Sequence, residues 1–246
     1  MSNRLLHGDG IVRRILTVFL IVDTSKSMYG KKMQAVNDAI AEILPILQCI
    51  SDNNPEAEIH ITCLQFSTGA VFLTDIPREA RDFEFVSMKA KGQTDLGAAI
   101  SLLETKLHTK GDGYMNHSSG AYTPIFILMS DGHPGDSYKR KLKTLKENKW
   151  FAYGVKIAIA IGNDAKKDIL AEFTGDPKSV ITVHNSKTLR ELIRLVTITS
   201  SSVCSQSTNV ENINKQSKII NAIKSAQIID SSDFGVDATQ VEDDWS

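Results

Sequence analysis

The sequence predicts an α/β protein in which helices cover a largely parallel sheet. Short apolar runs alternate with stretches of helical periodicity through most of the 246 residues, as is typical of strands joined by crossover helices. One connection differs, because only three residues separate the strand-like segments 58–66 and 70–76. A loop of this length fits a hairpin, with Gly69 expected in a left-handed conformation. The sheet is therefore expected to contain one antiparallel pair.

The remaining elements follow in a regular order. The apolar run 15–22 is expected to form the first buried strand. A helix should follow Gly30, because apolar residues recur there at steps of three and four: Met33, Val36, Ile40, Ile43 and Leu47. Pro45 lies inside this pattern and should kink or end the helix. Further strands are expected at 124–129, 153–161 and 180–183, and further helices around 96–107, 142–145, 169–173 and 189–196.

The composition predicts one domain, at residues 15–199, with an N-terminal extension at 1–14 and a C-terminal extension at 200–246. From Ser200 onward Ser, Asn and Gln become frequent, which is typical of a loosely ordered segment, and a weak helix is expected between 212 and 227. Residues 230–246 contain six acidic and no basic side chains, so this stretch should be mobile unless a partner binds it. Trp245 has no obvious core to join.

Charge and cysteine content exclude several classes of protein. The 28 Lys and Arg residues against 29 Asp and Glu give no basic footprint of a nucleic-acid binder. The three cysteines lack metal-like spacing and are expected to be small buried residues in a reducing compartment, without disulfides. The run 15–22 is too short to cross a bilayer, and no signal-peptide cleavage site follows it. We therefore expect a cytoplasmic protein that binds neither nucleic acid nor membrane.

Side chains with oxygen donors gather at the predicted strand ends. The segment 23–27 (Asp-Thr-Ser-Lys-Ser) directly follows the first strand, and other loops add Thr94 and Asp131. Ligands of open parallel sheets bind at the carboxyl ends of the strands, where such loops converge. Hydroxyls and carboxylates suit Mg²⁺, with Mn²⁺ or Ca²⁺ as alternatives. The candidate metal-site residues are therefore Asp23, Ser25, Ser27, Thr94 and Asp131.

The balance of hydroxyls and carboxylates indicates how such a metal ion would behave. Alternate side chains of a loop can point the same way, so Ser25 and Ser27 are expected to coordinate the ion directly. Asp23 and Asp131 are expected to act through bound water. An ion held mainly by neutral hydroxyls keeps much of its charge and favours an anionic ligand. A carboxylate from a partner protein could complete its shell, which predicts a binding module and no enzyme.

The candidate residues resemble a known motif. Asp23-x-Ser25-x-Ser27, Thr94 within a Gly-x-Thr-x-Leu run, and Asp131 followed by Gly are similar, in this order, to the metal-ion-dependent adhesion site of von Willebrand factor A domains. The resemblance covers about residues 15–199. It implies a doubly wound, mainly parallel, Rossmann-like sheet with one antiparallel edge strand, which agrees with the expected hairpin.

A narrower resemblance concerns the cellular setting. The loop Asp131-Gly132-x-Pro134-x-Asp136, the run 123–126 (Thr-Pro-Ile-Phe) and the run 203–207 (Val-Cys-Ser-Gln-Ser) resemble bacterial TerY-type proteins of tellurium-resistance and stress-response operons. That resemblance implies a cytoplasmic module that works with a kinase and a phosphatase. The chain itself contains no motif that identifies these partners.

The main alternative is a metal-dependent phosphatase or hydrolase with Asp23 as nucleophile. Phosphatases of the haloacid-dehalogenase type also place an Asp after the first strand of a related fold. They need a second Asp two positions later as general acid, whereas this chain has Ser25 there. No Gly-x-x-x-x-Gly-Lys-Ser/Thr phosphate-binding loop is present. A further hypothesis makes the Ser- and Thr-rich stretch after Thr199 a target of phosphorylation.

Other charged residues have simpler interpretations. The basic run 138–149 is typical of the solvated face of a helix, and the alternative is a surface that steers an acidic partner. An acidic residue from 230–244 could also dock on the metal of another copy, which leaves the oligomeric state open. Asp95 is expected to cap the helix that follows it and not to bind metal.

Overall fold

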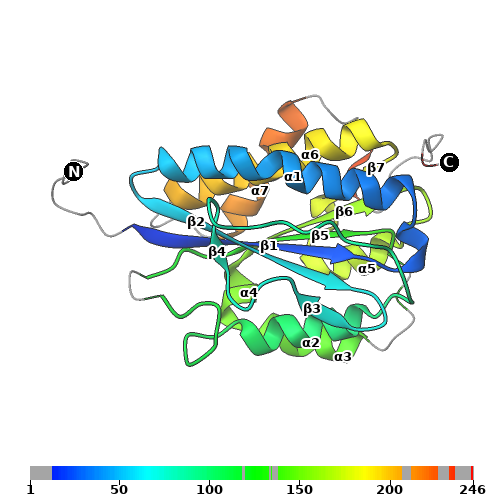
Figure 1. Cartoon of the computed structure of the whole chain (residues 1–246), viewed down its shortest axis with the longest axis horizontal. Helices are drawn as coiled ribbons and strands as arrows, with labels where there is room; N and C mark the ends of the chain where they lie inside the picture. Colours follow the sequence, from blue (N-terminus) through cyan, green and yellow to red (C-terminus); the bar gives the residue numbers. More distant parts are fainter. Residues whose placement is uncertain are drawn as a thin grey trace, which may run out of the picture.

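The computed structural model describes residues 13–117, 120–132, 134, 138–206, 212–226, 233–235 and 245. Within these residues one seven-stranded sheet lies between two layers of helices (Figure 1). The strands are β1 (Arg14–Asp23), β2 (Ala57–Phe66), β3 (Ala70–Phe72), β4 (Arg78–Glu79), β5 (Ile125–Ser130), β6 (Val155–Ile161) and β7 (Val180–Val183). The helices are α1 (Lys31–Asp52), α2 (Leu96–Lys106), α3 (Tyr138–Glu147), α4 (Lys149–Tyr153), α5 (Lys167–Thr174), α6 (Ser186–Gln206) and α7 (Asn212–Ser225), with 3₁₀ turns η1 (Lys26–Met28) and η2 (Pro177–Ser179).

The strand order is β3-β2-β1-β5-β6-β7, and β4 also pairs with β2. β1 pairs in parallel with both β2 and β5, and β6 and β7 continue the parallel arrangement. β3 and the short β4 pair with β2 in the antiparallel sense, because the loop after β2 is too short for a crossover. The predicted fold, a doubly wound and mainly parallel sheet with an antiparallel edge, is confirmed.

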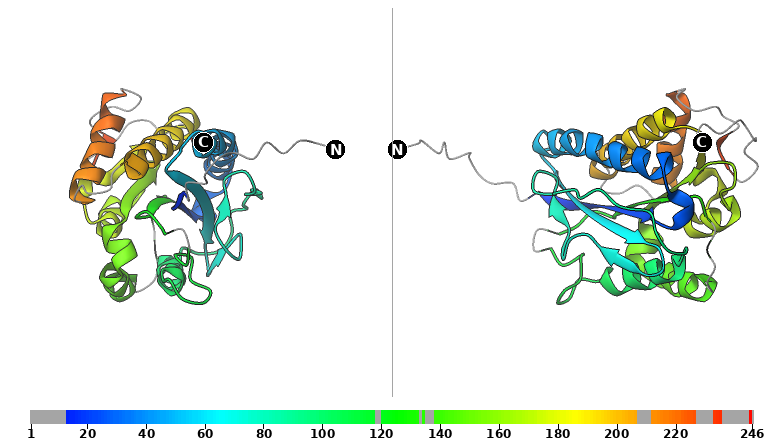
Figure 2. Two further views of the ribbon diagram at one scale, coloured as in Figure 1. Left: turned by 90° about the vertical axis from the view of Figure 1, so that its left-hand side faces the viewer. Right: turned by 45° about the vertical axis from the view of Figure 1, so that its right-hand side comes forward.

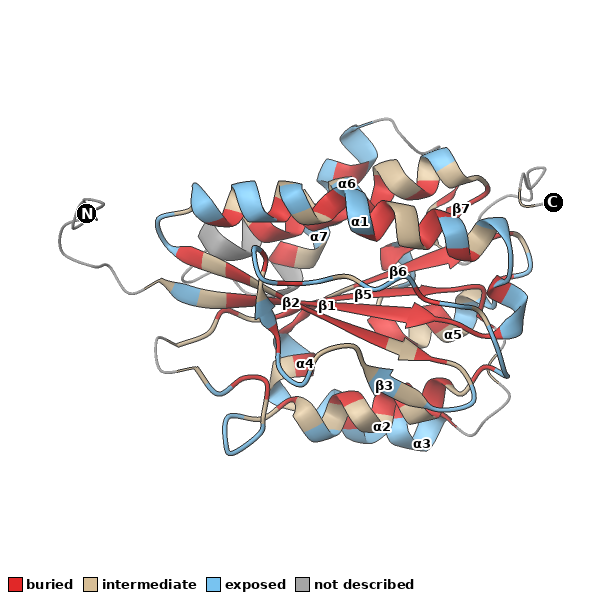
Figure 3. Cartoon of the chain, viewed as in Figure 1, coloured by how far each residue is buried: buried red, intermediate tan, exposed pale blue. Residues whose placement is uncertain are grey.

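The sheet separates two hydrophobic cores (Figure 3). Side chains of a strand alternate between its faces, so β1 contributes to both cores. One core, under α1, α6 and α7, receives Leu16, Val18, Leu20 and Val22, and the other, against α2, α3 and α5, receives Phe19 and Ile21. Each such side chain contributes about 1.5–3 kcal/mol on full burial. This double burial explains why β1 reads as a continuous apolar run.

Two local predictions differ from the structure. Pro45 does not end its helix, since α1 continues to Asp52, and the alternative of a kink at Pro45 stays a prediction. Pro45 and Ala41 are both exposed, so the hydrogen bond that proline removes from the helix lies on its solvent side. Gly69 is not among the glycines with a positive φ, and its carbonyl instead accepts a hydrogen bond from the Ser67 N–H at 2.8 Å.

The C-terminal part is more ordered than the composition predicts. α6 runs past residue 199 to Gln206 with Ser200 and Ser201 buried, so the expectation of loose order from Ser200 is wrong there. α7 confirms the helix expected near 212–227, and it lies beside α6 on the face that also carries α1 (Figure 2). Its buried residues Ile219, Ile220 and Ile223 belong to the core under α1. The domain boundary at 199/200 stays a prediction.

Three other residues of this region take part in the fold. Phe234 pairs with Ile181 of β7, and the Asp233 carboxylate lies 3.2 Å from the imidazole Nε2 of His184. Trp245 is partly buried against the core under α1, so the expectation that it has no core to join is wrong. The stretch 230–246 is outside the described residues except for 233–235 and 245.

The exposure of the cysteines and the apolarity of the helices can be compared with the expectations from the sequence. Cys63 is buried as expected, whereas Cys49 is exposed on the last turn of α1, and both are free thiols. The Cys204 side chain lies outside the described residues. None of the helices in the described residues combines the length and the apolarity that a bilayer crossing needs.

Candidate metal site

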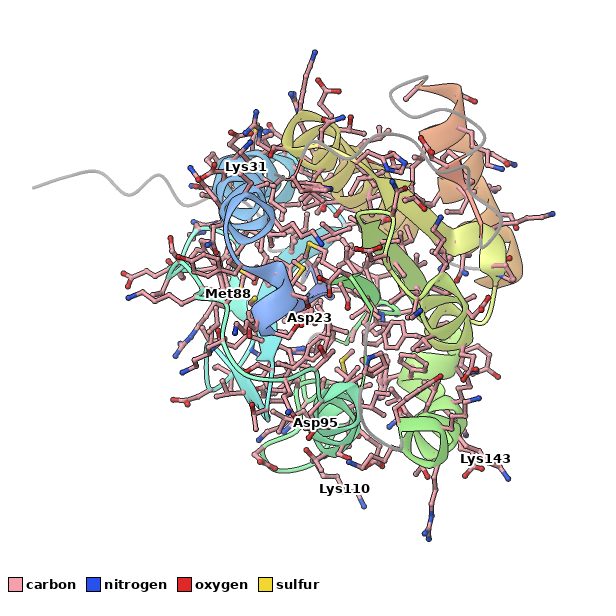
Figure 4. The ribbon with its side chains drawn as sticks, turned by 90° about the vertical axis from the view of Figure 1, so that its right-hand side faces the viewer. Asp23, Lys31, Met88, Asp95, Lys110 and Lys143 are labelled. Atoms are coloured by element: carbon pink, nitrogen blue, oxygen red, sulfur yellow. The ribbon has the colours of Figure 1, made fainter. Side chains whose placement is uncertain are left out.

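The carboxyl ends of β1 and β5 bring two of the predicted loops to one place (Figure 4). β1 ends at Asp23, which is fully buried, and β5 ends at Ser130, directly before Asp131. Val22 lies opposite Met129 in the parallel register, so the residues that follow each strand are neighbours. Residues 108 positions apart therefore meet at one edge of the sheet because of the strand order.

A continuous chain of hydrogen bonds joins four of the five candidate residues. The Ser25 N–H donates to Asp23 Oδ1 at 2.8 Å, and the hydroxyls of Ser25 and Ser27 lie 3.0 Å apart. The Ser27 hydroxyl then donates to Asp131 Oδ1 at 2.9 Å. Ser25 is extended and directly precedes η1, a tight turn that brings the two serine hydroxyls together. The predicted convergence of Asp23, Ser25, Ser27 and Asp131 is thus present in the structure.

Thr94 reaches the same edge through its loop. The Lys26 N–H donates to the Gly92 carbonyl at 3.0 Å, and the Lys91 N–H donates to the Thr24 carbonyl at 2.7 Å, so two backbone bonds tie the loops together. Thr94 is 8% exposed. Among the described residues, the hydrogen bonds that join the other four do not include the Thr94 hydroxyl. Thr94 is therefore placed beside the chain of bonds, not within it.

Gly92 is required where the two loops meet. Its φ is +74°, a backbone conformation that residues other than glycine rarely adopt. A Cβ at this position would also clash with the Thr68 hydroxyl oxygen. This hydroxyl accepts the Gln93 N–H at 3.1 Å. The close approach fixes the loop that carries Thr94.

Ser130 is a further member of the site that the sequence pattern does not single out. Its hydroxyl donates to Asp23 Oδ2 at 2.6 Å and accepts the Gly132 N–H at 2.7 Å. Asp23 therefore accepts a hydrogen bond at each of its oxygens. The place of Ser130 directly before Asp131 was the available signal, but only the register of β5 against β1 shows that it faces Asp23.

Lys32 is a second residue that the sequence pattern does not single out. Its ammonium nitrogen lies 3.3 Å from Asp131 Oδ2, and the two side chains are only 16% and 2% exposed. Lys32 lies in the first turn of α1, five residues after Ser27. Nothing in the sequence distinguishes it from the exposed Lys31. The entry angle of α1 decides which of the two lysines reaches the site.

The negative charges of the Asp23 and Asp131 carboxylates repel each other. Burial raises the pKa of Asp23 above its ordinary value, and the negative charge of Asp131 adds to this increase. Hydrogen bonds from Ser130 and Ser25 act in the opposite direction and favour the ionised form. A buried pair of like charges is stabilised by any cation placed beside it. The site therefore favours a cation, and Lys32 supplies one positive charge.

The donor set fits a hard divalent ion. Within the described part of the chain, no group of three or more His, Cys, Asp or Glu side chains is placed to hold a metal ion. The residues that do converge offer carboxylate and hydroxyl oxygens, which suit Mg²⁺, Mn²⁺ or Ca²⁺.

Neighbouring polar residues have other roles. The Asp95 carboxylate accepts the Ala98 N–H at 2.7 Å and caps α2, which confirms the capping role expected for it. Lys139 of the basic run pairs with Glu172 of α5 at 3.4 Å, and Lys143 stays exposed. Asp136 of the narrower resemblance lies outside the described residues.

A doubly wound α/β sheet with an Asp-x-Ser-x-Ser loop at its carboxyl edge defines the class of this domain. The von Willebrand factor type A domain family matches residues 17–195, and the chain belongs to this family. A comparison with curated proteins found no match.

Solved structures share this fold. Proximal thread matrix protein 1 from the mussel byssus has a TM-score of 0.56 at 22% identity, covering 74% of this chain and 47% of its own. The von Willebrand factor type A protein from Catenulispora acidiphila has a TM-score of 0.54 at 16% identity, covering 74% and 41%. One structure of the mussel protein has a zinc-occupied MIDAS motif. These identities show the fold alone, and this chain spans less than half the length of these proteins.

Proposed function

We propose that this protein is a Mg²⁺-dependent binding module that recruits an acidic residue of a partner protein. The observation that carries the proposal is the hydrogen-bonded chain from Asp23 through Ser25 and Ser27 to Asp131. These hydrogen bonds bring together, at the carboxyl ends of β1 and β5, motif residues from two separate loops. The zinc-occupied motif of the mussel relative supports the view that such a donor set takes a divalent ion.

The roles of the residues follow from their charge and burial. Ser25, Ser27 and Thr94 would supply neutral hydroxyl ligands, and Asp23 and Asp131 would orient metal-bound waters and balance the charge. When bound, the ion supplies a positive charge that attracts an anionic ligand. Ser27 is the exposed member of the set, so the side chains leave the ion reachable from solvent on that side. A partner's carboxylate is the protein group that matches this charge and hardness.

The alternative, a phosphatase with Asp23 as nucleophile, has weaker support. Asp23 is 0% exposed, and Ser25 N–H and Ser130 Oγ–H occupy one oxygen each. A nucleophilic carboxylate needs an oxygen that is free to approach the phosphorus atom. Position 25 also lacks the carboxylic acid that would protonate the leaving group. The geometry therefore favours binding over group transfer.

The cellular setting is part of the same proposal. The resemblance to TerY-type proteins supports a cytoplasmic role in a bacterial stress or tellurium-resistance system, with a kinase or phosphatase among the partners. Nucleic acid and membrane are not expected as ligands, because the overall charge is close to neutral. The oligomeric state stays open.

Calorimetric titration with Mg²⁺, Mn²⁺, Ca²⁺ and Zn²⁺ tests the proposal. Asp23→Ala should abolish divalent-ion binding while the circular dichroism spectrum stays that of the folded domain. Asp82→Ala is the matched control, because Asp82 is exposed and lies in the turn after β4, away from the site. Unchanged Mg²⁺ affinity in Asp23→Ala would refute the assignment. Mg²⁺-dependent hydrolysis of p-nitrophenyl phosphate that disappears in the same variant would instead establish the enzyme.

A further inference from the structure

A pocket of about 490 Å³ lies beside the metal loop, between the start of α1 and the segment 87–90. Met33 and Met88 line it and are each 4% exposed, so the pocket borders the hydrophobic core under α1. Tyr29 lines the same pocket and is 78% exposed. Methionine side chains adapt to apolar groups of different shape, and an exposed tyrosine provides a large contact area at low entropic cost.

The pocket wall is fixed before any partner arrives. The Asn37 side chain of α1 donates to the Met88 carbonyl at 3.0 Å and accepts the Met88 N–H at 2.9 Å. These two bonds pair the amide of Asn37 with the backbone of the opposite wall. A preformed pocket loses less conformational entropy when a ligand binds.

The pocket and the metal site are within reach of one short peptide segment. Tyr29 follows Ser27 by two residues, so their Cα atoms lie at most about 7 Å apart. Met88 lies opposite Asn37, which is about 9 Å along the axis of α1 from Lys31. An extended segment advances about 3.3 Å per residue. A residue one to three positions from a metal-bound acidic residue can therefore place its side chain in the pocket.

The charges around this edge indicate what else the segment carries. Lys26, Lys89 and Lys91 are exposed, and within the described part of the chain no carboxylate pairs with their ammonium groups. Lys89 and Lys91 also line a second pocket of about 290 Å³ next to Thr24. Asp38, directly after Asn37 in α1, is one carboxylate in the lining of the first pocket. The three exposed lysines outnumber it, so the net charge of these residues is positive.

We propose that the pocket formed by Tyr29, Met33 and Met88 binds an apolar side chain of the same acidic partner segment whose carboxylate reaches the metal ion, and that Lys26, Lys89 and Lys91 favour further acidic residues of that segment. This inference rests on the proposed metal-dependent function. It specifies the partner as an extended acidic segment with one large apolar residue within three positions of the metal-bound acid. The combination supplies selectivity that a single carboxylate cannot, because a lone acidic side chain occurs on every protein surface.

Selection from a random heptapeptide display library tests the inference. The full chain is immobilised, peptides are bound in Mg²⁺, and those released by chelator are sequenced. The expected consensus is an acidic residue with a large aliphatic or aromatic residue one to three positions away. Chelator-released peptides with acidic residues and no apolar preference would overturn this inference and leave the proposed function intact. If no peptide depends on Mg²⁺, the proposed function fails, and the inference falls with it.

Variants then locate the contact, with the best selected peptide measured by fluorescence anisotropy. Tyr29→Ser should weaken peptide binding by about tenfold, as expected for an aromatic anchor. Tyr153→Ser is the matched control, because Tyr153 is also exposed, at 55%, but precedes β6 at the opposite sheet edge. Peptide affinity that is unchanged in Tyr29→Ser, or that falls only as far as Mg²⁺ affinity falls, would overturn the inference.

Charge reversal separates the basic edge from the pocket. Lys89→Glu should weaken the same peptide by about tenfold at low salt and less at high salt, because exposed charges are screened. Lys143→Glu changes the net charge equally on the distant α3 and should leave the affinity within twofold (Figure 4). Equal losses in the two variants would show a general charge effect and would contradict the basic edge.

Discussion

Replacing Lys32 with methionine should tighten Mg²⁺ binding. The Lys32 ammonium lies 3.3 Å from Asp131 Oδ2, and both side chains are largely buried. At an effective dielectric constant of about 20, two unit charges at this distance attract by about 5 kcal/mol before desolvation and solvent screening reduce the value. Because Lys32 keeps some exposure, the net contribution should be about 1–2 kcal/mol, toward the lower end of what hydrogen bonds with a charged group contribute.

This free energy stabilises the metal-free protein, and a divalent ion at Asp131 must offset it. If Lys32 contributes nothing once the ion is bound, its removal should lower the Kd for Mg²⁺ by about five- to thirtyfold, since 1.4 kcal/mol corresponds to tenfold. The metal-free variant should lose the same free energy of unfolding, because ligand binding and folding are linked. Saturating Mg²⁺ should then restore wild-type stability.

Isothermal titration calorimetry gives the Kd, and urea denaturation with and without Mg²⁺ gives the stability. Lys31→Met is the control, because Lys31 is the preceding residue of the same helix and is exposed, so solvent screens its charge. Its Kd should stay within twofold of wild type. Weaker Mg²⁺ binding in Lys32→Met would refute the reasoning, because it would mean that Lys32 supports the metal-bound site.

Three further predictions concern the surroundings of the site. Gly92→Ala should lower the free energy of unfolding by about 1–3 kcal/mol and weaken Mg²⁺ binding, because Gly92 has a φ of +74° and a Cβ would meet the Thr68 hydroxyl. Thermal unfolding measures the stability and calorimetry the Mg²⁺ affinity, and a stable variant with normal affinity would contradict the role of Gly92. Asp95→Ala should cost about 1 kcal/mol through loss of the α2 cap with no change in Mg²⁺ affinity, so a large loss of affinity would show that Asp95 belongs to the metal site. Burial raises the pKa of the Cys63 thiol to about 12, so at pH 8 about one molecule in ten thousand carries the thiolate. A variant with serine at the other two cysteines should therefore react with Ellman's reagent only after denaturation. Rapid reaction of this variant in its native state would contradict the burial of Cys63.

The sequence shows the class of the fold because burial on both faces leaves a clear pattern. β1 and β5 are continuous apolar runs, since helices cover both sides of the central strands. The short loop after β2 likewise indicates an antiparallel edge. A single residue predicts the local structure less well, because its surroundings can offset its own preference. Pro45 remains within α1 because its position on the exposed side of the helix makes the lost hydrogen bond tolerable.

The C-terminal region shows a different limit. Ser, Asn and Gln residues after position 200 are typical of loose segments, yet Ser200 and Ser201 are buried where α6 packs. The isoleucines of α7 complete the core under α1. Local composition cannot show this, because the packing partners of these residues come from distant parts of the chain.

For the site, the amino-acid order alone shows which oxygen donors are available and in which order the loops supply them. Asp23, Ser25, Ser27, Thr94 and Asp131 could be chosen because each follows a predicted strand or precedes a predicted helix. Three features become visible only in the folded chain: Ser130 faces Asp23, Lys32 rather than Lys31 reaches Asp131, and a pocket lined by two methionines lies next to the metal loop. These contacts depend on strand register and on the angle at which α1 leaves η1, and neither quantity is encoded in a local pattern of residues.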